Sequence, residues 1–385
     1  MIYVALRMLM GDRGKYFGIL FGLTIASFLI TQQMAIFMGL MTRTYGFITD
    51  SGLADVWTMD PKVQFIDDIK PMQETQLLRV RGVEGVDWAV PLYKGILKAR
   101  LDSGSFQACN VIGLDDSTLI GGPATMLEGR LDDLRRADGI IVDVVGAKGR
   151  LARRGKDGTS IPLKIGDTVE LNDHRAVVVG ICKVSRTFQS QPVVYTTYTR
   201  ATTFAPMERK RLSFIQVKAK AGVDPKALAA KIAKTTGLAA YTKPEFEDLT
   251  IGYFMKYTGI PVNFGIAVML GFLVGTAIAG QTFYNFTLDN LKYFAALKAM
   301  GATNLKLLGM VVVQALLVGG LGFGLGTGLA TIFGSYFGSR TELAFRLPWQ
   351  VLVITACAMA IISTFAALLS LWKVIRLEPA VVFKG

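Results

Sequence analysis

The sequence predicts a membrane protein in which four transmembrane α-helices carry a large external α+β domain, inserted between the first and second helices. Three observations support this fold class. The 385 residues are 51% hydrophobic and only 18% charged, and the mean hydropathy is +0.42, which is too apolar for an ordinary soluble protein. The apolar residues gather in four long runs. Between the first two runs, residues 43–260 have the composition of a soluble domain.

The four apolar runs are long enough to cross a bilayer. A transmembrane helix needs about 20 apolar residues, and these runs contain no charged residue. The first run has 25 residues, more than the apolar region of a signal peptide, so we predict that it is retained. The runs cover residues 17–41, 264–283, 307–337 and 351–372.

Loops and tails follow from these spans. The segment 1–16 has apolar residues at helical spacing and is predicted to lie on the membrane surface. The predicted division is 1–16, an amphipathic N-terminal segment; 17–42, the first span and the start of a stalk; 43–260, the external domain with stalk segments; 261–288, the second span; 289–306, a connecting loop; 307–337, the third span; 338–350, a short external loop; 351–372, the fourth span; and 373–385, a tail.

Basic residues in the short segments indicate the orientation. The segments 1–16, 289–306 and 373–385 together carry nine Lys or Arg residues, whereas 338–350 carries two. Short cytoplasmic loops are enriched in Lys and Arg. We therefore expect both termini and the loop 289–306 in the cytoplasm. The net charge of +13 does not indicate nucleic-acid binding, because the external block carries no long basic stripe.

The external block alternates between strand and helix patterns, which predicts an α+β domain. Turn residues at 102–105 and 172–173 indicate two hairpins. Asp224 and Gly237 are suited to begin and end a helix. The expected helices are 71–81, 225–236 and 248–259, and the expected strands are 94–101, 106–113, 139–145, 168–171, 176–184, 192–199 and 212–218.

Catalytic and metal-binding chemistry has little support in the sequence. His174 is the only histidine, so the usual zinc ligand sets are not indicated. The adjacent carboxylates at 67–68, 115–116 and 132–133 are interpreted as solvated loop residues. Residues 149–157 superficially resemble a phosphate-binding loop, but Asp157 replaces the Ser or Thr that binds magnesium. We predict no catalytic residue, metal or cofactor on this chain.

The three cysteines allow two interpretations. Cys109 and Cys182 fall in expected external strands and would form a disulfide only if those strands are neighbours. Whether they pair stays open at this point. Cys357 lies within the fourth apolar run, where a packing role is favoured.

Small residues recur at every fourth position in the spans, which allows close approach of helices. Gly18 and Gly22 show this spacing in the first span, and Gly271 and Gly275 in the second. The third span has the same spacing at 320, 324 and 328. Packing within one chain and a homodimer interface both remain possible. The first two spans are favoured for the interface, because they flank the external domain.

The loop 289–306 contains a short amphipathic helix. Tyr293, Leu297 and Met300 fall on one face, and Phe294 is expected to be exposed on a neighbouring face. Gly301 suits the left-handed position after the helix, and Thr303 can cap the next helix. An apolar, basic-flanked helix outside the membrane needs a surface to bind. The alternative is a helix that rests on the lipid surface.

The same loop carries a family resemblance. Residues 291–303 read L-K-x-F-A-x-L-K-A-M-G-A-T and resemble the loop of FtsX/MacB-type (type VII) permeases of ABC transporters. The longer stretch 259–301 resembles the DevC branch of that family. In the external domain, 111–114, 128–130 and 165–169 resemble the MacB-like core. Unlike MacB, this sequence carries no recognisable ATPase, which is similar to DevC and the lipoprotein-releasing permeases.

The resemblance implies a homodimeric permease of the bacterial inner membrane with a large periplasmic domain. A separate cytoplasmic ABC ATPase would bind ATP and Mg²⁺, and the permease would pass its movement on by mechanotransmission. In DevC-like systems a periplasmic adaptor (membrane fusion) protein and a TolC-type outer-membrane channel complete an efflux system. The alternatives are a lipoprotein-releasing permease and an FtsX-like regulator of a cell-wall hydrolase. No substrate residue is indicated. The residues implied in ATPase coupling are Lys292, Tyr293, Phe294, Leu297, Lys298, Met300 and Gly301, with Glu378 and Pro379 in the tail.

Overall fold

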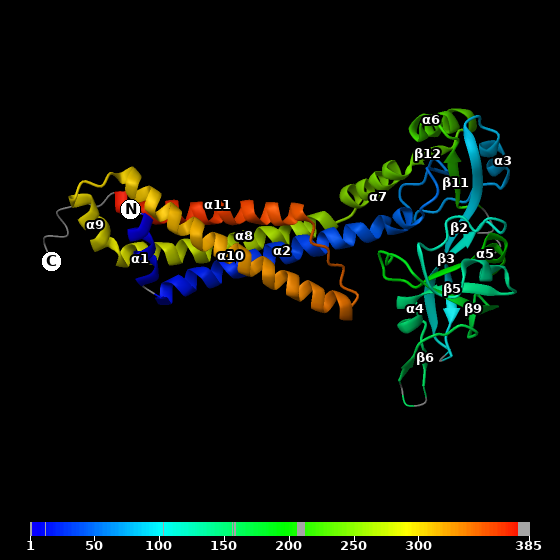
Figure 1. The fold of residues 1–385 in the computed structure, drawn as a ribbon, viewed down its shortest axis with the longest axis horizontal. Helices are drawn as coiled ribbons and strands as arrows, with labels where there is room; N and C mark the ends of the chain where they lie inside the picture. The colour runs from blue at the N-terminus through cyan, green and yellow to red at the C-terminus, as the bar shows by residue number, and fades with distance from the viewer. Residues whose placement is uncertain are drawn as a thin grey trace. The chain divides into compact units, whose positions relative to one another are not determined.

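The computed structural model describes residues 2–11, 13–102, 104–155, 157, 159–205 and 212–375. The chain divides into two compact units. The membrane unit comprises Met1–Leu40 and Gly259–Gly385, and the external unit comprises Met41–Thr258. Figure 1 shows that the membrane unit is helical and that the external unit mixes strands and helices.

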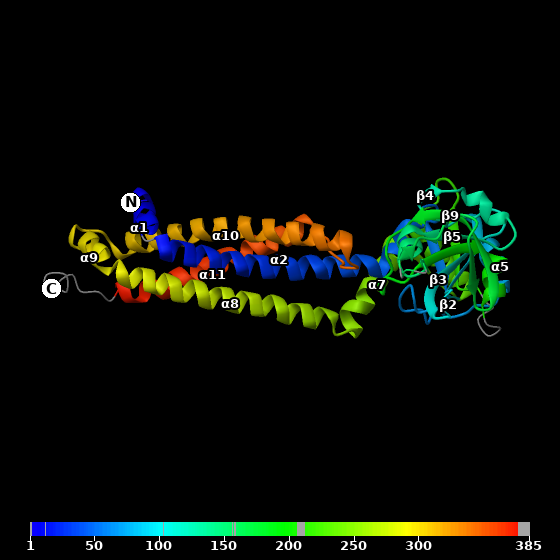
Figure 2. The same ribbon diagram turned by 90° about the horizontal axis from the view of Figure 1, so that it is seen from below.

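Four helices of the described residues are long and apolar enough to cross a bilayer. Figure 2 shows them as the long rods of the membrane unit, and α11 packs against both α8 and α10. A shorter helix, α1 (Ile2–Gly11), buries Leu9 in the same apolar cluster. The four long helices are α2 (Arg13–Asp50), α8 (Ile260–Asp289), α10 (Asn304–Arg340) and α11 (Trp349–Ile375).

Glycines bring α2 close to α8 on one side. A methyl group at Gly22 would collide with Ile278, and one at Gly275 would collide with Ala26. Gly271 lies against Leu29 and Ile30, and Gly18 faces Thr282. These faces are therefore filled by packing within one chain. The close approach that the spacing predicted therefore serves the packing of α2 against α8, and a homodimer interface at Gly18, Gly22, Gly271 and Gly275 stays a prediction.

Glycines also bring α2 close to α10. A methyl group at Gly326 would lie 2.5 Å from the Ser27 Cβ and 2.6 Å from the Thr24 carbonyl oxygen. By contrast, nothing lies within 4 Å of the corresponding positions at Gly320, Gly324 and Gly328. The helix α2 therefore has close glycine contacts with two neighbours in the membrane unit.

The external unit is built on one large, mixed sheet. Its strand order is β12-β1-β11-β2-β3-β10-β5-β9-β4, and β8 pairs with β2 and β9. The pairs β10–β3 and β5–β9 are parallel and the others antiparallel. A separate hairpin is formed by β6 (Arg153–Arg154) and β7 (Ser160–Ile161). The strands of the large sheet are β1 (Val56–Met59), β2 (Val86–Arg100), β3 (Phe106–Leu114), β4 (Thr125–Glu128), β5 (Gly139–Asp143), β8 (Thr168–Leu171), β9 (His174–Lys183), β10 (Val193–Thr197), β11 (Phe214–Ala219) and β12 (Ala239–Thr242).

Short helices join these strands. The best anticipated is α6 (Pro225–Thr236), where the Asp224 carboxylate accepts from the backbone N–H groups of 226 and 227. Gly237 follows with a φ of 74°, as predicted for the end of that helix. The other helices are α3 (Thr75–Arg81), the 3₁₀ turn η1 (Leu131–Arg135), α4 (Val144–Lys148), α5 (Tyr198–Phe204) and α7 (Lys243–Tyr257).

Several predicted boundaries were wrong for local reasons. The strand expected over 139–145 ends at Asp143, because the Asp143 carboxylate accepts from the Gly146 N–H and starts α4. The strand expected over 192–199 gives way to α5 at Tyr198. The helix expected over 248–259 begins earlier, where Thr242 and Glu245 form a capping box.

The disulfide left open by the sequence does not form, and Cys109 and Cys182 are both free. They lie on β3 and β9, which β10 and β5 separate in the sheet. Neighbouring strands are about 4.8 Å apart, so three steps give about 14 Å. A disulfide needs Cα atoms within about 7 Å.

Large side chains fill the core of the external unit. Trp57 is fully buried and its ring contacts those of Phe47, Phe214 and Phe246. Aliphatic residues of β3, β5 and β10 belong to the same apolar cluster. This packing holds the end of α2, which supplies Phe47 and Ile48, against the sheet.

Candidate functional site

A short helix, α9 (Leu291–Ala299), follows α8 after a defined turn. The carbonyl oxygen of Asn290 accepts from the N–H groups of Tyr293 (3.0 Å) and Phe294 (3.2 Å). The Asn290 side-chain amide donates to the carbonyl oxygen of Phe286 at 2.8 Å. One residue thus ends α8 and starts α9, which fixes the direction of the short helix.

The end of α9 is equally well defined. The Gly301 N–H donates to the Lys298 carbonyl and the Ala302 N–H to the Leu297 carbonyl, both at 3.0 Å. This pair of bonds is a Schellman motif, which needs a left-handed residue. Gly301 has a φ of 91°, which confirms its predicted role. Thr303 occupies the cap position of α10, but its hydroxyl makes no capping hydrogen bond.

Exposed apolar side chains occur on α9, in the turn after it and in the first turn of α10. Tyr293 is 62% exposed, Met300 75% and Leu305 76%. Lys292 and Gly301 are also exposed, and Lys298 is half-buried. An exposed apolar surface next to lysines is typical of a contact with another molecule.

The predicted exposure of Phe294 is wrong, because this ring is only 1% exposed. It belongs to the apolar cluster of the membrane unit, with Leu9, Ile19 and Phe283. Leu297 is half-buried and packs against the same cluster. The amphipathic pattern identified an apolar face but not its neighbour, and here the membrane bundle itself covers part of it.

The structure thus brings together only part of the predicted set. Lys292, Tyr293, Met300 and Gly301 are each exposed, whereas Phe294 and Leu297 pack against the apolar cluster of the membrane unit. Leu305 was missed, although a leucine beside Lys306 and before the apolar run was the available signal. Glu378 and Pro379 lie outside the described residues.

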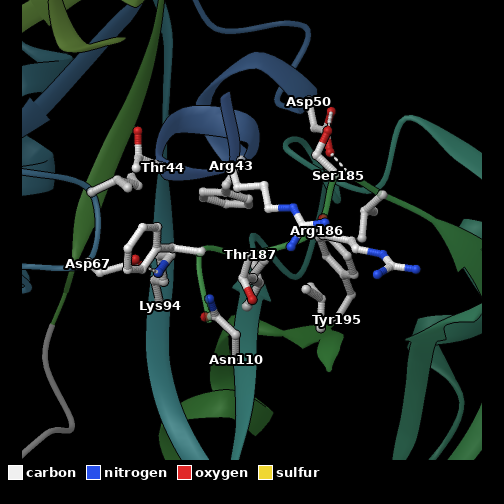
Figure 3. Close-up of a pocket in the computed structure, with 16 residues that line it drawn as sticks. Arg43, Thr44, Asp50, Asp67, Lys94, Asn110, Ser185, Arg186, Thr187 and Tyr195 are labelled. Carbon is white, nitrogen blue, oxygen red and sulfur yellow. Dashed lines mark hydrogen bonds and ion pairs between the residues drawn. The ribbon is translucent and has the colours of Figure 1, made fainter. Parts of the chain in front are cut away.

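A second site, lined in part by polar side chains, lies in the external unit around the end of α2 (Figure 3). It encloses about 20 Å³, which is room for about one water molecule. The Lys94 ammonium is almost fully buried and pairs with the Asp67 carboxylate. The Oδ1 atom of buried Asn110 has no hydrogen-bond partner. The lining residues are Arg43, Thr44, Phe47, Asp50, Ile66, Asp67, Lys94, Asn110, Ile112, Val184, Ser185, Arg186, Thr187, Phe188, Val193 and Tyr195.

Polar contacts in this region tie the end of α2 to the loop that follows β9. The Asp50 carboxylate accepts from the Ser185 N–H (2.7 Å) and hydroxyl (3.0 Å). The Arg43 guanidinium donates to the Ser190 hydroxyl at 3.2 Å. The cavity is too small for a substrate, so its polar groups serve to fix this part of α2 within the external unit.

The same helix end is also tied to α7. The Thr49 hydroxyl donates to the Glu247 carboxylate at 2.8 Å, and the Lys243 ammonium donates to the Thr49 carbonyl oxygen at 2.7 Å. Residues 43–50 therefore contact the loop after β9 on one side and the helix α7 on the other.

Reactive chemistry is not indicated by the described side chains. No group of three His, Cys, Asp or Glu residues suited to a metal ion occurs among them. Burial raises the pKa of the Cys109 and Cys182 thiols to about 12, so neither is a thiolate at neutral pH. Burial also raises the pKa of Asp143, against the effect of its backbone hydrogen bonds.

Two family matches together cover most of the chain. Residues 17–235 match the MacB-like periplasmic core domain, and residues 260–379 match the FtsX-like permease C-terminal domain. The chain belongs to the FtsX/MacB-type family of ABC-transporter permeases. This permease therefore has the four membrane helices and inserted α+β domain of its family, as the sequence predicted.

Three solved structures of domains or regions of other proteins resemble part of this permease. The extracellular domain of the ABC-type transporter YknZ, from Gram-positive bacteria, is 16% identical and covers 50% of this chain and 99% of its own, with a TM-score of 0.34. The periplasmic region of MacB from Actinobacillus actinomycetemcomitans is 18% identical and covers 54% and 95%, with a TM-score of 0.37. A domain of a permease protein from Porphyromonas gingivalis is 13% identical and covers 50% and 88%, with a TM-score of 0.30. The search of curated proteins gave no match.

Membership in this family has two direct consequences. The permease is the transmembrane component of an ABC system, and the family implies an ABC ATPase as its partner. The four spanning-capable helices make it a multi-pass membrane protein.

Proposed function

We propose that this permease is the mechanotransmitting subunit of a DevC-like exporter in the bacterial inner membrane. A separate cytoplasmic ATPase binds the exposed surface formed by Lys292, Tyr293, Met300 and Leu305, named here the coupling surface. ATP-driven movement of that surface changes the periplasmic domain of a permease homodimer. An adaptor protein and a TolC-type channel then complete the efflux path.

The observation that carries this proposal is the coupling surface on an anchored helix. Tyr293, Met300 and Leu305 are exposed, while Phe294 lies in the apolar core of the membrane unit. A partner that binds the exposed side of α9 therefore acts on a helix that cannot move independently of the other helices of the membrane unit. Since α2 runs unbroken from Arg13 to Asp50, one element of that bundle also reaches into the external unit.

Substitution of Met300 tests the contact with the ATPase. Burial of such a side chain contributes about 1.5–3 kcal/mol, and a buried carboxylate adds a desolvation cost. Met300→Asp should weaken ATPase binding about tenfold or more, since 1.4 kcal/mol corresponds to tenfold. The measurement is binding of the purified ATPase to the permease in nanodiscs, with Met300→Leu as the matched apolar control.

The outcomes distinguish between two binding partners of α9, the ATPase and the lipid surface. Unchanged ATPase affinity in Met300→Asp would contradict the proposal. If α9 instead rests on lipid, the variant would weaken the seating of the loop on the bilayer and leave ATPase binding intact.

The proposed orientation has its own test. The nine basic residues of the short segments predict that α9 lies in the cytoplasm. In a Met300→Cys variant, a membrane-impermeant maleimide should label position 300 only after the inner membrane is permeabilised. A cysteine at exposed Lys220 should react in cells whose outer membrane alone is permeable. The reverse pattern would refute the orientation.

Co-purification distinguishes export from the two alternatives. An exporter should retain an ATPase together with a periplasmic adaptor. A lipoprotein-releasing permease should retain an ATPase and lipoprotein, and an FtsX-like regulator should retain a cell-wall hydrolase. Recovery of a hydrolase without an adaptor would replace the export proposal.

A further inference from the structure

An ion pair joins two helix ends in the membrane unit, next to α9. The ammonium of Lys15, in the first turn of α2, pairs with the carboxylate of Asp289, the last residue of α8. The two residues are 274 positions apart in the sequence. The Lys15 side chain is 30% exposed and that of Asp289 58%, so the pair is partly screened by water.

Each charge lies at the unfavourable end of its own helix and pairs with the opposite charge at the end of the other helix. A helix carries partial positive charge at its N-terminus and partial negative charge at its C-terminus. Asp289 reaches the first turn of α2, where Arg13 and Lys15 are otherwise unfavourable. Lys15 reaches the last turn of α8, where a cation is favourable. The ion pair therefore offsets two unfavourable charges, Lys15 at the start of its own helix and Asp289 at the end of its own helix.

The ion pair also lies next to the start of α9. Asp289 directly precedes Asn290, which starts α9 and donates to the Phe286 carbonyl. On its inner face, α9 is held by Phe294 in the apolar cluster. The packing of Phe294 fixes the distance of α9 from the apolar cluster. The ion pair also fixes the start of α9 relative to the start of α2.

We propose that Lys15 and Asp289 are positioning residues that lock the coupling surface to the start of α2. Their bond makes a displacement of α9 move the cytoplasmic end of α2. This inference rests on the proposed function for its consequence, ATPase coupling, but the lock itself is a property of the permease alone.

The lock is tested first without an ATPase. Spin labels on cysteines at Phe17 (α2) and Ala296 (α9), both exposed, report the distance between the two helices. The background carries Cys357→Ser, since that thiol is exposed, whereas Cys109 and Cys182 are buried. Permease in nanodiscs should give one narrow distance distribution. Asp289→Asn should broaden it, while Lys306→Gln, which removes a charge from the same loop, should leave it narrow.

The second measurement is the permease-stimulated turnover of the ATPase. Asp289→Asn and Lys15→Gln should each lower it about threefold, since partly exposed ion pairs contribute less than a tenfold change. The double variant should lose no more than either single variant, because the two residues act through one bond. Lys15→Arg should retain the wild-type turnover, and the affinity for the ATPase should not change in any variant.

Two results would overturn the inference. One is an unchanged distance distribution in Asp289→Asn, and the other is a double variant that loses the product of the single losses. Failure of the proposed function looks different, because the ATPase would then not bind the wild-type permease while the distance measurement would still show the lock.

Discussion

The two units of this permease hold their interiors together by different means. In the external unit, rings such as Trp57, Phe214 and Phe246 fill the space between sheet and helices. In the membrane unit, the contact between α2 and α10 depends on Gly322 and Gly326, which have no side chain at all. The external unit is stabilised by removing apolar surface from water. Helices in lipid lack that driving force and depend on close backbone approach.

Polar groups follow the same division. In the membrane unit, the Ser27 hydroxyl donates to the Phe323 carbonyl at 3.2 Å, and the Thr31 and Thr355 hydroxyls are 3.4 Å apart. These bonds join helices directly. In the external unit, polar side chains also join elements, and carboxylates such as Asp143 and Asp224 start helices by accepting from backbone N–H groups. The external unit should therefore be sensitive to lost volume, and the membrane unit to added volume.

The largest effect is expected in the external core. Phe214→Ala removes a fully buried ring and should lower the free energy of unfolding of the external unit by about 3–5 kcal/mol. Hydrogen exchange of residues 56–59 and 214–219 in the intact permease measures it. Phe106→Ala, at an exposed ring of the same sheet, is the control and should change exchange little. Equal effects at both positions would contradict the core assignment.

One added methyl group should be enough to disturb the membrane unit. Gly326→Ala places a Cβ 2.5 Å from that of Ser27 and should cost about 1–3 kcal/mol. Gly324→Ala, two residues away, meets open space and should leave stability unchanged or slightly higher, because Ala favours helix. Thermal unfolding of the two purified variants gives the comparison. A loss of the same size in both would show that α2 and α10 do not meet as described.

A smaller effect is expected at the start of α7. The pKa of Glu245 is lowered by hydrogen bonds from Thr242, first from its backbone N–H and then from its hydroxyl. The carboxylate therefore stabilises the external unit at pH values above 4.5, the ordinary pKa, and this contribution is lost as the pH falls through the lowered value.

Glu245→Gln keeps an acceptor for Thr242 but loses the negative charge at the helix start, so it should reduce stability by about 0.3–1 kcal/mol at neutral pH and by less in acid. Asp248→Asn, at an exposed acid of the same helix, is the matched control. Hydrogen exchange of residues 243–257 across pH supplies the readout. A difference between wild type and Glu245→Gln that does not shrink in acid would argue against the capping role.

Local signals in the sequence were sufficient for features that depend on one or two residues. Asp224, Gly237 and Gly301 each predicted the helix end that they form. The four spans followed from apolar length, which the bilayer imposes. The short strands β1 and β12 were missed, since four residues carry too little pattern and their pairing partners are distant in the chain.

The choice between neighbours could not be read from periodicity. Phe294 and Tyr293 are adjacent and both apolar, yet one ring is buried and the other exposed. The third span likewise has glycines at 320, 322, 324 and 326, of which 322 and 326 contact α2. Only the position of the facing helix decides which set is buried, and the sequence does not contain that position in any local pattern.

The central claim is that ATP hydrolysis by the ATPase bound at the coupling surface alters the external unit through α2. Hydrogen exchange of residues 43–50 and 184–190 tests it most directly, in the permease–ATPase complex with and without ATP. These segments include the contacts of Asp50 and Arg43 with Ser185 and Ser190. We expect ATP to change their exchange, and Met300→Asp to abolish that change. Identical exchange in both states, with the ATPase bound and turning over ATP, would contradict the account.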